Sequence, residues 1–473
     1  MLIGRQSEQN ILKTLLEEEE SQFCAIYGRR RVGKTYLVRE TFNYNFAFQH
    51  TGASNEPLKK QLENFHRSLM NCGMGKCARP KNWMDAFNML AKLLETKEDK
   101  KKVVFIDELP WMDTPKSGLI SALEHFWNSW ATARREKDII LIVCGSATSW
   151  ITDNIKNNHG GLHNRLTRQI YLKPFSLLEC EKYAKARNLV LERKQIAELY
   201  MVLGGIPFYW SMVEKSDSVQ QCVDRLFFHE DAKLKNEFES LYASLFKKPE
   251  PYIKIVTALG SQKSGLSRDE IIKATGLSDN GSFSKQLNDL ELCGFVRKYK
   301  SYGKTERNEL IQLIDNYTLF YFKFIKENIN GDTDFWLHNN DTQIHNTWAG
   351  LAFERLCLQH IEQIKKALGI SGVICSAQSW RASKSADHDG AQIDLLLVRN
   401  DSITNIIEMK YSKYSYRLNG EDIESLMRKR SVFKNVTQTK SSVHITMATT
   451  YGVEHNAYWN DIQSEITLDD LFQ

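Results

Sequence analysis

Residues 23–35 read FCAIYGRRRVGKT, and this stretch decides the fold of the N-terminal part of the chain. The first five residues are an apolar run of strand length, and the residues that follow, 36–42 (YLVRETF), have the apolar spacing of a helix. The loop between them has the spacing GxxxxGKT, in which glycines let backbone N–H groups turn inward around phosphate oxygens. Strand, glycine-rich loop and helix in this order predict a site for a nucleoside triphosphate.

The residues of this loop have separate expected roles. The start of the helix adds a partial positive charge that favours phosphate. Lys34 is expected to reach the β- and γ-phosphates of ATP, and the hydroxyl of Thr35 to ligate Mg²⁺. The expected nucleotide-binding positions here are Gly28, Arg29, Arg30, Arg31, Val32, Gly33, Lys34, Thr35 and Tyr36.

Two further apolar runs end in polar residues that suit the same site. Residues 101–108 (KKVVFIDE) predict a strand that ends in two carboxylates. Asp107 is expected to hold the Mg²⁺ shell, and Glu108 to orient and polarise the attacking water. Residues 139–146 (IILIVCGS) predict another strand, after which Ser146 either senses the γ-phosphate or caps the next helix.

The order of these and other motifs resembles that of the prokaryotic archaeal-type ATPases, which are related to the AAA+ and STAND P-loop proteins. The remaining motifs are Gly4-Arg5 with Glu8, the segment LKPF at 172–175 and GGIPFY at 204–209. The resemblance covers roughly residues 1–240. It implies that Gly4 and Arg5 lie near the adenine, and that Pro207 marks a second sensor after a helical lid.

The resemblance also implies an arginine that acts on the γ-phosphate, in the same subunit or in a neighbouring one. Arg165 matches that position, but Asn164 precedes it where the family often has glycine, so the choice between Arg165 and Arg168 stays open. A surface arginine without such a role is the alternative for either. A homo-oligomer formed through the ATPase domain is a further expectation.

Residues 250–315 predict a different module. Helical patterns at 252–260, 268–275 and 282–293 precede two strand-like runs, with a capping-box pattern at Ser267 and Glu270. Helices followed by a hairpin resemble the winged-helix modules that follow the ATPase in this family. Such a module can place a helix in a DNA groove and a wing on the backbone. The candidate DNA contacts are Lys285, Arg297, Lys298, Lys300, Lys304 and Arg307.

An internal packing module is the alternative interpretation of the same segment. Charged hairpins are usually solvated, and a winged helix in a multidomain ATPase can serve packing alone. The aromatic-rich residues 316–329 are expected to form a buried connecting helix. DNA contact and internal packing both stay open for this module.

Four residues near the C-terminus have a pattern of their own. Glu354 lies in an amphipathic helical run, Asp394 near the start of a strand-like run, and Glu408 and Lys410 two apart on the next run. Side chains two apart on a strand share a face. An acid and a lysine on a buried face are costly unless they are paired or bound to a metal. An ion pair on a strand surface is the alternative.

This pattern resembles the PD-(D/E)xK nuclease superfamily over about residues 345–450, with Ile393 in place of its proline. The resemblance implies that Glu354, Asp394 and Glu408 hold a metal ion and that Lys410 offsets charge in the transition state. The implied chemistry is metal-assisted phosphodiester hydrolysis. Candidate backbone contacts are Lys413, Arg417, Arg428, Lys429 and Arg430.

Length and composition fit a multidomain α/β protein. The chain has 473 residues, which exceeds the roughly 250–300 residues that one core sustains. The expected domains are a P-loop ATPase core with a parallel sheet (1–180), a helical lid (181–245), a winged helix (246–335) and a restriction-endonuclease-like α/β domain (336–473). Hydrophobic residues at 42% and charged residues at 26% exclude a wholly disordered, collagenous or coiled-coil chain.

Other features bear on partners and compartment. The net charge of +5 identifies no partner by itself. No secretory signal is visible, and the longest uncharged apolar stretch, 139–152, is too short to cross a membrane. The odd count of nine cysteines, with no second Cys/His pair after Cys72 and Cys77, favours reduced thiols over disulfides or zinc. These features predict a cytoplasmic protein.

The leading functional hypothesis is an ATPase that uses ATP and Mg²⁺ and couples nucleotide state to DNA binding, with metal-dependent DNA cleavage as a further activity. The alternative is a nucleotide-dependent signalling or scaffold switch whose nuclease-like domain binds nucleic acid or protein without cutting. A nuclease that acts on RNA is a third hypothesis.

Overall fold

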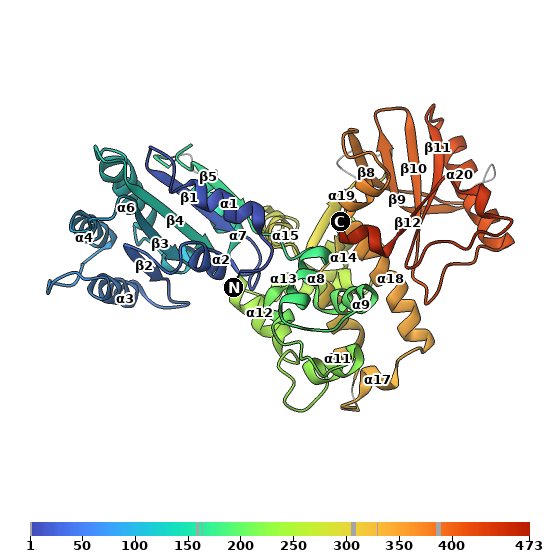
Figure 1. The fold of residues 1–473 in the computed structure, drawn as a ribbon, viewed down its shortest axis with the longest axis horizontal. Helices are drawn as coiled ribbons and strands as arrows, with labels where there is room; N and C mark the ends of the chain where they lie inside the picture. The colour runs from blue at the N-terminus through green and yellow to red at the C-terminus, as the bar shows by residue number, and fades with distance from the viewer. Residues whose placement is uncertain (1, 158–159, 163, 304–308, 329, 385–388) are drawn as a thin grey trace. The chain divides into compact units, whose positions relative to one another are not determined.

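The computed structural model describes residues 2–157, 160–162, 164–303, 309–328, 330–384 and 389–473 (Figure 1). The chain divides into two compact units. The first comprises residues 1–174 and 245–247, and the second comprises 175–244 and 248–473.

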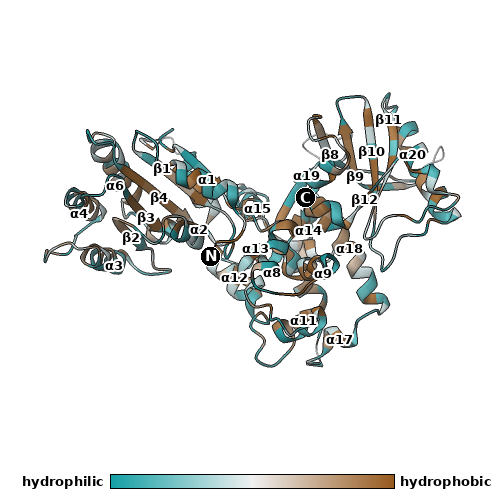
Figure 2. Cartoon of the chain, in the orientation of Figure 1, coloured by the Kyte–Doolittle hydropathy of each residue, from teal (hydrophilic) through white to brown (hydrophobic). Residues whose placement is uncertain are grey.

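The first unit contains a parallel β-sheet with the strand order β2-β3-β4-β1-β5. Its strands are β1 (Gln22–Tyr27), β2 (Phe48–Thr51), β3 (Lys102–Asp107), β4 (Ile139–Gly145) and β5 (Arg168–Tyr171). Every residue of β1, β3 and β4 is buried. Continuous apolar strands form because helices cover both faces of a parallel sheet, and Figure 2 shows these strands as hydrophobic. The strands predicted at 23–27, 101–108 and 139–146 are confirmed.

Helices cover this sheet. They are α1 (Gln6–Thr14), α2 (Lys34–Thr41), α3 (Leu58–Asn71), α4 (Trp83–Glu95), α5 (Leu109–Met112), α6 (Leu119–His125) and α7 (Thr148–Ile151), with π-helical turns η1 (Phe126–Ala131) and η2 (Thr152–Lys156). The core between α3, α4, α6 and the sheet is rich in aromatic side chains, among them Phe65, Trp83 and Trp127. This burial stabilises the sheet whose carboxyl edge carries the loop at 28–35.

Strand β4 lies between β1 and β3, with which it pairs in parallel on either side. The loops that follow these strands therefore leave the same edge of the sheet, although they are far apart in sequence. Ligands of open α/β sheets bind at this carboxyl edge. The strand order thus gathers the phosphate loop, Ser146 and the Asp107-Glu108 pair.

The second unit begins with helices. These are α8 (Leu177–Ala186), α9 (Arg193–Leu203), α10 (Pro207–Trp210), α11 (Val219–Phe227) and α12 (Glu237–Leu245). The side chains of Ser176 and Glu179 form a capping box that begins α8. His360 joins α8 to the C-terminal region, because its Nε2 accepts a hydrogen bond of 3.2 Å from the backbone N–H of Leu177.

The next segment contains α13 (Glu250–Gly260), α14 (Arg268–Thr275) and α15 (Gly281–Leu292), followed by the strands β6 (Val296–Tyr299) and β7 (Leu310–Leu313). The two strands pair antiparallel. The capping box of Ser267 and Glu270 forms as predicted. Helices and a hairpin are therefore present where the sequence predicts them, and we call residues 250–313 the helix–hairpin module.

An aromatic cluster connects this module to the C-terminal region. It contains α16 (Asn316–Phe320), the π-helical turn η4 (Tyr321–Ile325) and α17 (Phe335–His338). Phe320 and Phe324 each pack against Trp336 and Trp348, with ring centroids 4.9–5.7 Å apart. The buried helix predicted at 316–329 is thus present as α16 and η4, with residue 329 outside the described residues.

The C-terminal sheet has the strand order β12-β11-β10-β9-β8 (Figure 1). Its strands are β8 (Cys375–Ala382), β9 (Ala391–Arg399), β10 (Ile403–Lys410), β11 (Ser442–Thr449) and β12 (Ser464–Thr467). The helices of this region are α18 (Gln343–Gln359), α19 (Ile361–Ala367) and α20 (Gly420–Thr437). Its 3₁₀ turns are η5 (Trp459–Asp461) and η6 (Leu468–Phe472). Strands β8, β9 and β10 pair antiparallel, and β10, β11 and β12 pair parallel. The hairpin predicted around 399–402 joins β9 to β10.

Every cysteine of the chain lies in the described part, and each is a free thiol, as predicted. Within the described ranges, no helix has both the length and the apolar character needed to cross a membrane.

Candidate functional site

The phosphate loop runs from the end of β1 at Tyr27 to the start of α2 at Lys34. Gly28 has φ 145°, and a Cβ at this position would lie 2.4 Å from the carbonyl oxygen of Leu172. Gly33 has φ 92° and forms the N-cap of α2. Both positions therefore require glycine, the first because a backbone approaches it closely and the second because of its left-handed backbone.

Lys34 is buried, with 5% of its surface exposed. Its ammonium donates hydrogen bonds to the carbonyl oxygens of Gly28 (2.9 Å) and Arg29 (3.0 Å) and to Oγ of Ser146 (3.2 Å). These bonds hold the charge over the loop, where phosphate oxygens are expected.

Thr35 and Asp107 form the second contact of the site. The hydroxyl of Thr35 donates to Oδ2 of Asp107 over 2.7 Å, and Oδ1 of Asp107 accepts from the backbone N–H of Glu108 over 3.0 Å. Burial raises the pKa of Asp107, and the neighbouring charge of Glu108 raises it further, whereas the bond from Thr35 lowers it. A hydroxyl beside a buried carboxylate is a donor set that fits Mg²⁺.

Glu108 has a left-handed backbone, with φ 48° at the N-cap of α5. This conformation costs a residue with a side chain roughly 1–2 kcal/mol. Its carboxylate accepts two hydrogen bonds from Ser146, one from the backbone N–H (3.0 Å) and one from the hydroxyl (2.5 Å). Ser146 thus links Lys34 to Glu108. The alternative of a helix-capping Ser146 is wrong, because the N-cap of α7 is Ala147.

Arg5 is buried at the N-cap of α1, with φ 58°. Its guanidinium donates to the carbonyl oxygen of Lys173 over 2.5 Å, and the carbonyl oxygen of Gly4 accepts from Gln9 over 2.8 Å. Arg5 therefore ties the N-terminal segment to the LKPF segment after β5. The position of both residues near the adenine remains a prediction.

The arginine alternatives differ in their surroundings. Arg168 lies on β5 and pairs with Glu18 over 2.7 Å. Arg165 is exposed and follows Asn164, whose backbone is left-handed with φ 53°. The role expected of one of these arginines remains a prediction. Pro207 begins α10 in the second unit, and its sensor role remains a prediction.

The C-terminal residues come from the elements expected. Glu354 lies on α18, Asp394 on β9, and Glu408 and Lys410 on β10. Burial raises the pKa of Glu354 to about 7, and the negative charges of Asp394 and Glu408 contribute to that increase. The structure therefore brings Asp394 and Glu408 close enough to Glu354 to raise its pKa.

Glu408 is nevertheless engaged by two lysines. Its Oε1 lies 3.3 Å from Nζ of Lys410, and its Oε2 accepts a hydrogen bond of 2.6 Å from Lys429. Among the described residues, no three Asp, Glu, His or Cys side chains gather in a metal-binding arrangement. The expected centre of Glu354, Asp394 and Glu408 is thus not assembled as a three-ligand set among the described residues, and both carboxylate oxygens of Glu408 contact lysines.

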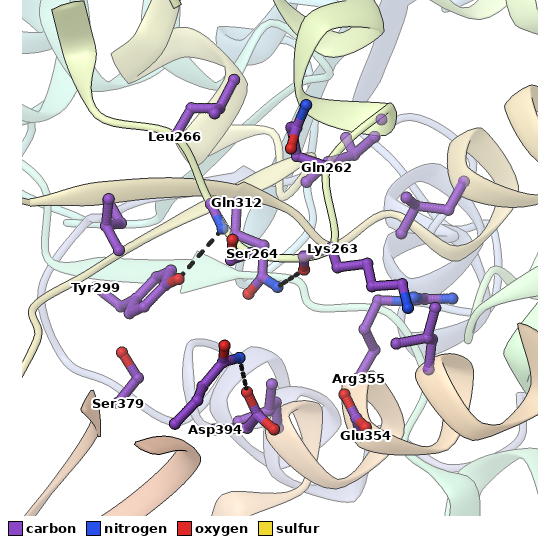
Figure 3. Close-up of a pocket in the computed structure, with 18 of the residues that line it drawn as sticks. Gln262, Lys263, Ser264, Leu266, Tyr299, Gln312, Glu354, Arg355, Ser379 and Asp394 are labelled. Atoms are coloured by element: carbon purple, nitrogen blue, oxygen red, sulfur yellow. Dashed lines mark hydrogen bonds between the residues drawn. The ribbon is translucent and has the colours of Figure 1, made fainter. Parts of the chain in front are cut away.

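Glu354 and Asp394 line a cavity of about 830 Å³ in the second unit (Figure 3). Its walls come from the helix–hairpin module, from α18 and from β8 and β9, and they include Lys263, Arg297, Tyr299, Arg355 and Trp380. Asp394 accepts a hydrogen bond of 2.7 Å from Gln392. Sequence patterns did not indicate this cavity, since its walls are up to about 130 residues apart.

Several cations expected on nucleic acid contact acidic or polar side chains of the protein. Lys298 pairs with Glu291 (2.7 Å), Lys285 with Asp289 (3.7 Å), Lys413 with Asp341 (2.6 Å) and Arg417 with Glu454 (3.9 Å). Arg297 donates to Gln312 over 2.8 Å and lies over the ring of Tyr299. Lys304 and Arg307 lie outside the described residues. Lys429 contacts Glu408. The sequence did not predict this contact, because the two residues are far apart in the chain.

Comparison with known proteins agrees with the N-terminal site. Residues 2–213 match the family described as "ATPase domain predominantly from Archaea". The match includes the phosphate loop, Asp107, Glu108 and Ser146. The protein is therefore an ATPase, and its N-terminal part is similar to the archaeal-type ATPase domain that the sequence resembles.

A relative and two solved structures are similar over most of the chain. The uncharacterized protein MJECL04 of Methanocaldococcus jannaschii is 22% identical over 432 residues, which are 90% of each chain. The Walker-type ATPase Paby2304 of Pyrococcus abyssi has a TM-score of 0.48 and 16% identity, covering 68% of this chain and 96% of its own. The ORC2 protein of Aeropyrum pernix, solved in ADPNP–ADP complexes, has a TM-score of 0.41 and 14% identity, covering 70% and 95%.

Proposed function

We propose that this ATPase hydrolyses ATP with Mg²⁺ and uses the nucleotide state to control nucleic-acid binding by its second unit. The observation that carries the proposal is the chain of contacts from Lys34 through Ser146 to Glu108, beside the Thr35–Asp107 pair. These groups combine a cation for phosphate, a donor set for Mg²⁺ and a carboxylate for water at one edge of the sheet.

In the proposed reaction, loop N–H groups and Lys34 bind the phosphates of ATP. Thr35 and Asp107 would hold Mg²⁺, which supplies charge neutralisation between the β- and γ-phosphates. Glu108 takes a proton from a water molecule whose oxygen bonds to the γ-phosphorus. The bond to the β–γ bridging oxygen breaks, and ADP and phosphate leave. Arg165, from the same or a neighbouring subunit of a homo-oligomer, offsets the developing charge.

Hydrogen bonds within the second unit support coupling between its N-terminal helices and the C-terminal cluster. Tyr411, directly after Lys410, donates to Glu198 of α9 over 2.7 Å. Asn316 donates to the carbonyl oxygen of Tyr200, also on α9, over 3.0 Å. Movement of α9 would therefore be transmitted to the end of β10.

The C-terminal cluster supports a second activity, metal-assisted hydrolysis of a phosphodiester. The closeness of Asp394 and Glu408 to Glu354, with Lys410 in contact with Glu408, supports this assignment. Mg²⁺ usually takes one or two carboxylates and completes its shell with water and substrate oxygens, so Glu354 and Asp394 on one cavity wall fit it. Lys410 would offset negative charge as water attacks phosphorus and releases a proton to solvent, while the bond to the leaving deoxyribose oxygen breaks and that oxygen takes a proton from solvent.

The alternative is a switch that binds nucleic acid or protein without cutting it. The two lysines on Glu408 favour this alternative, because they already satisfy the charge of a proposed metal ligand. DNA is the nucleic acid that we propose as partner for either activity.

One set of assays tests these proposals. ATP turnover is measured for the wild type and for Lys34→Ala, which is expected to abolish it. Cleavage of plasmid and single-stranded DNA with Mg²⁺ or Mn²⁺, with and without ATP, is measured beside Glu408→Ala. Cleavage that survives Glu408→Ala would contradict the assigned site, and ATP turnover without any cleavage would favour the switch.

A further inference from the structure

The cavity that contains Glu354 and Asp394 is bounded by the helix–hairpin module on one side and by α18 and the C-terminal sheet on the other (Figure 3). On the module side, Tyr299 of β6 and Gln312 of β7 face the cavity. On the other side, Glu354 and Arg355 extend from α18, and Asp394 from β9. A ligand that reaches the carboxylates must therefore enter between these walls.

The hairpin is attached to the C-terminal sheet. The backbone N–H of Tyr302 donates to the carbonyl oxygen of Ser379 on β8 over 2.8 Å, and Ser301 forms a parallel β-bridge with Ser379. The ring of Tyr302 packs against Phe433 of α20, with centroids 5.1 Å apart. These contacts use both the backbone and the side chain of the turn, so the module wall is part of the folded core.

The size of the cavity restricts what it accepts. A volume of about 830 Å³ belongs to the range of pockets that hold small ligands. A sphere of this volume is about 12 Å across. This diameter is about the same as the width of the major groove alone of a DNA duplex. A duplex is wider than its own groove, so it cannot reach the carboxylates while the walls remain in contact. One or two unpaired nucleotides are of suitable size.

The chemistry of the walls suits a phosphodiester chain. Among the described residues, the lining includes five lysine or arginine side chains, Lys263, Arg297, Lys323, Arg355 and Arg381, against three carboxylates, Glu270, Glu354 and Asp394. The buried Nε of Arg355 has no hydrogen-bond partner within the described part of the chain. Tyr299 adds an aromatic ring, and cationic grooves with aromatic rings bind single strands with little sequence preference.

We infer that this cavity admits single-stranded nucleic acid, such as an unpaired end or a flap, and excludes intact duplex. The inference deepens the proposed phosphodiester hydrolysis and rests on it for the cleavage step. The phosphates would meet Arg297 and Arg355, and the base would meet Tyr299.

Binding and cleavage together test this inference on the full chain. Fluorescently labelled dT20, rU20 and a duplex dumbbell closed by non-nucleotide linkers are compared with Mg²⁺ or Mn²⁺, and binding is measured by anisotropy with the Glu408→Ala protein. We expect dT20 to bind and to be cut at least tenfold better than the dumbbell. Equal cleavage of dT20 and the dumbbell would overturn the inference while leaving the proposed hydrolysis intact.

Neighbouring residues on β6 provide a matched pair of variants. Arg297 faces the cavity, whereas Lys298 pairs with Glu291 outside it. In the Glu408→Ala background, Arg297→Gln is expected to weaken binding of dT20 about tenfold and Lys298→Gln less than twofold. Because Arg297 also bonds Gln312, the exposed pair Lys263→Gln and Lys323→Gln provides a second test if Arg297→Gln fails to fold.

The remaining outcomes are also decisive. If dT20 binds through Arg297 but nothing is cut, the proposed hydrolysis fails and the cavity inference holds. If rU20 binds tenfold tighter than dT20, the inference holds with RNA as the ligand. If neither strand binds, or if Lys298→Gln weakens binding as much as Arg297→Gln, the inference is wrong.

Discussion

The hydroxyl of Ser146 donates a hydrogen bond of 2.5 Å to Glu108 and accepts one of 3.2 Å from Lys34. The serine follows β4, which lies between β1, the strand that precedes the loop to Lys34, and β3, the strand that ends just before Glu108. A single small side chain thus fixes the carboxylate proposed to activate water relative to the ammonium proposed to bind phosphate.

Replacement of Ser146 by alanine tests this relationship. We expect Ser146→Ala to lower kcat for ATP roughly tenfold to a hundredfold, since a misplaced general base loses part of its contribution of about 10²–10⁴. The Kd for ATP should change less than threefold, because Lys34 retains its bonds to the loop. Steady-state kinetics and nucleotide titration measure both quantities. A large loss of affinity with unchanged kcat would contradict the assigned role of the Ser146–Glu108 contact.

The phosphate loop predicts a contrast between two glycines. Gly28→Ala would place a Cβ 2.4 Å from a backbone oxygen, whereas a Cβ at Gly75 meets nothing within 4 Å. We therefore expect Gly28→Ala to weaken ATP binding at least tenfold, about 1.4 kcal/mol, and Gly75→Ala to leave it unchanged. Calorimetric titration with ATP compares the two. Equal affinity of both variants would show that the loop relaxes without cost.

The contact of Lys429 with Glu408 predicts competition with metal ions. Removal of this ammonium by Lys429→Met frees Oε2 of Glu408, so we expect Mn²⁺ to bind about threefold to tenfold more tightly, ~0.7–1.4 kcal/mol. Lys434→Met, at an exposed position on the same helix, should leave the affinity as it is. Calorimetry with Mn²⁺ provides the measurement. If both variants bind Mn²⁺ like the wild type, Lys429 does not compete for the carboxylate.

His360 predicts a loss of stability in acid. The side chain is 2% exposed, and burial lowers the pKa of this histidine to about 4. The unfolded chain binds a proton near pH 6.5, but the folded chain does not, so stability falls as the pH drops from about 6.5 to 4. Between pH 7 and pH 5 the contribution of His360 should fall by about 2 kcal/mol.

Urea unfolding of the wild type and of His360→Gln at pH 7 and pH 5 measures this contribution. Glutamine can still accept from Leu177 but does not titrate, so this variant should lose less stability at pH 5. His50 in the first unit, whose pKa burial also lowers to about 4, is present in both proteins and cancels in the comparison. An equal pH dependence of the two proteins would refute the prediction.

Much of the N-terminal site could be predicted because its signals are local. GRRRVGKT encodes a turn, a charge and a helix start within eight residues, and apolar runs of strand length precede Asp107 and Ser146. A strand that is buried on both faces consists almost entirely of apolar residues, so its apolar composition alone predicts it. The direct contact of Ser146 with Glu108 was not predictable, because it depends on the strand order.

In the C-terminal region, less of the site could be predicted from the sequence. Glu354, Asp394, Glu408 and Lys410 could be named from spacing, yet spacing did not reveal that Lys429 would contact Glu408. Arg297 was named as a nucleic-acid contact from its charge, but the sequence did not show that it lines a cavity or that the neighbouring turn pairs with Ser379 through Tyr302. These contacts join residues that are 21 and 77 positions apart.

The sequence by itself determined the elements of this protein and the chemistry of its phosphate loop, because backbone preference and apolar periodicity act over a few residues. The tertiary structure alone decided which partners the charged side chains take and which of them share the cavity. The physical reason is that ion pairs and cavity walls depend on distances in space, and these distances are set only when sheets and helices pack.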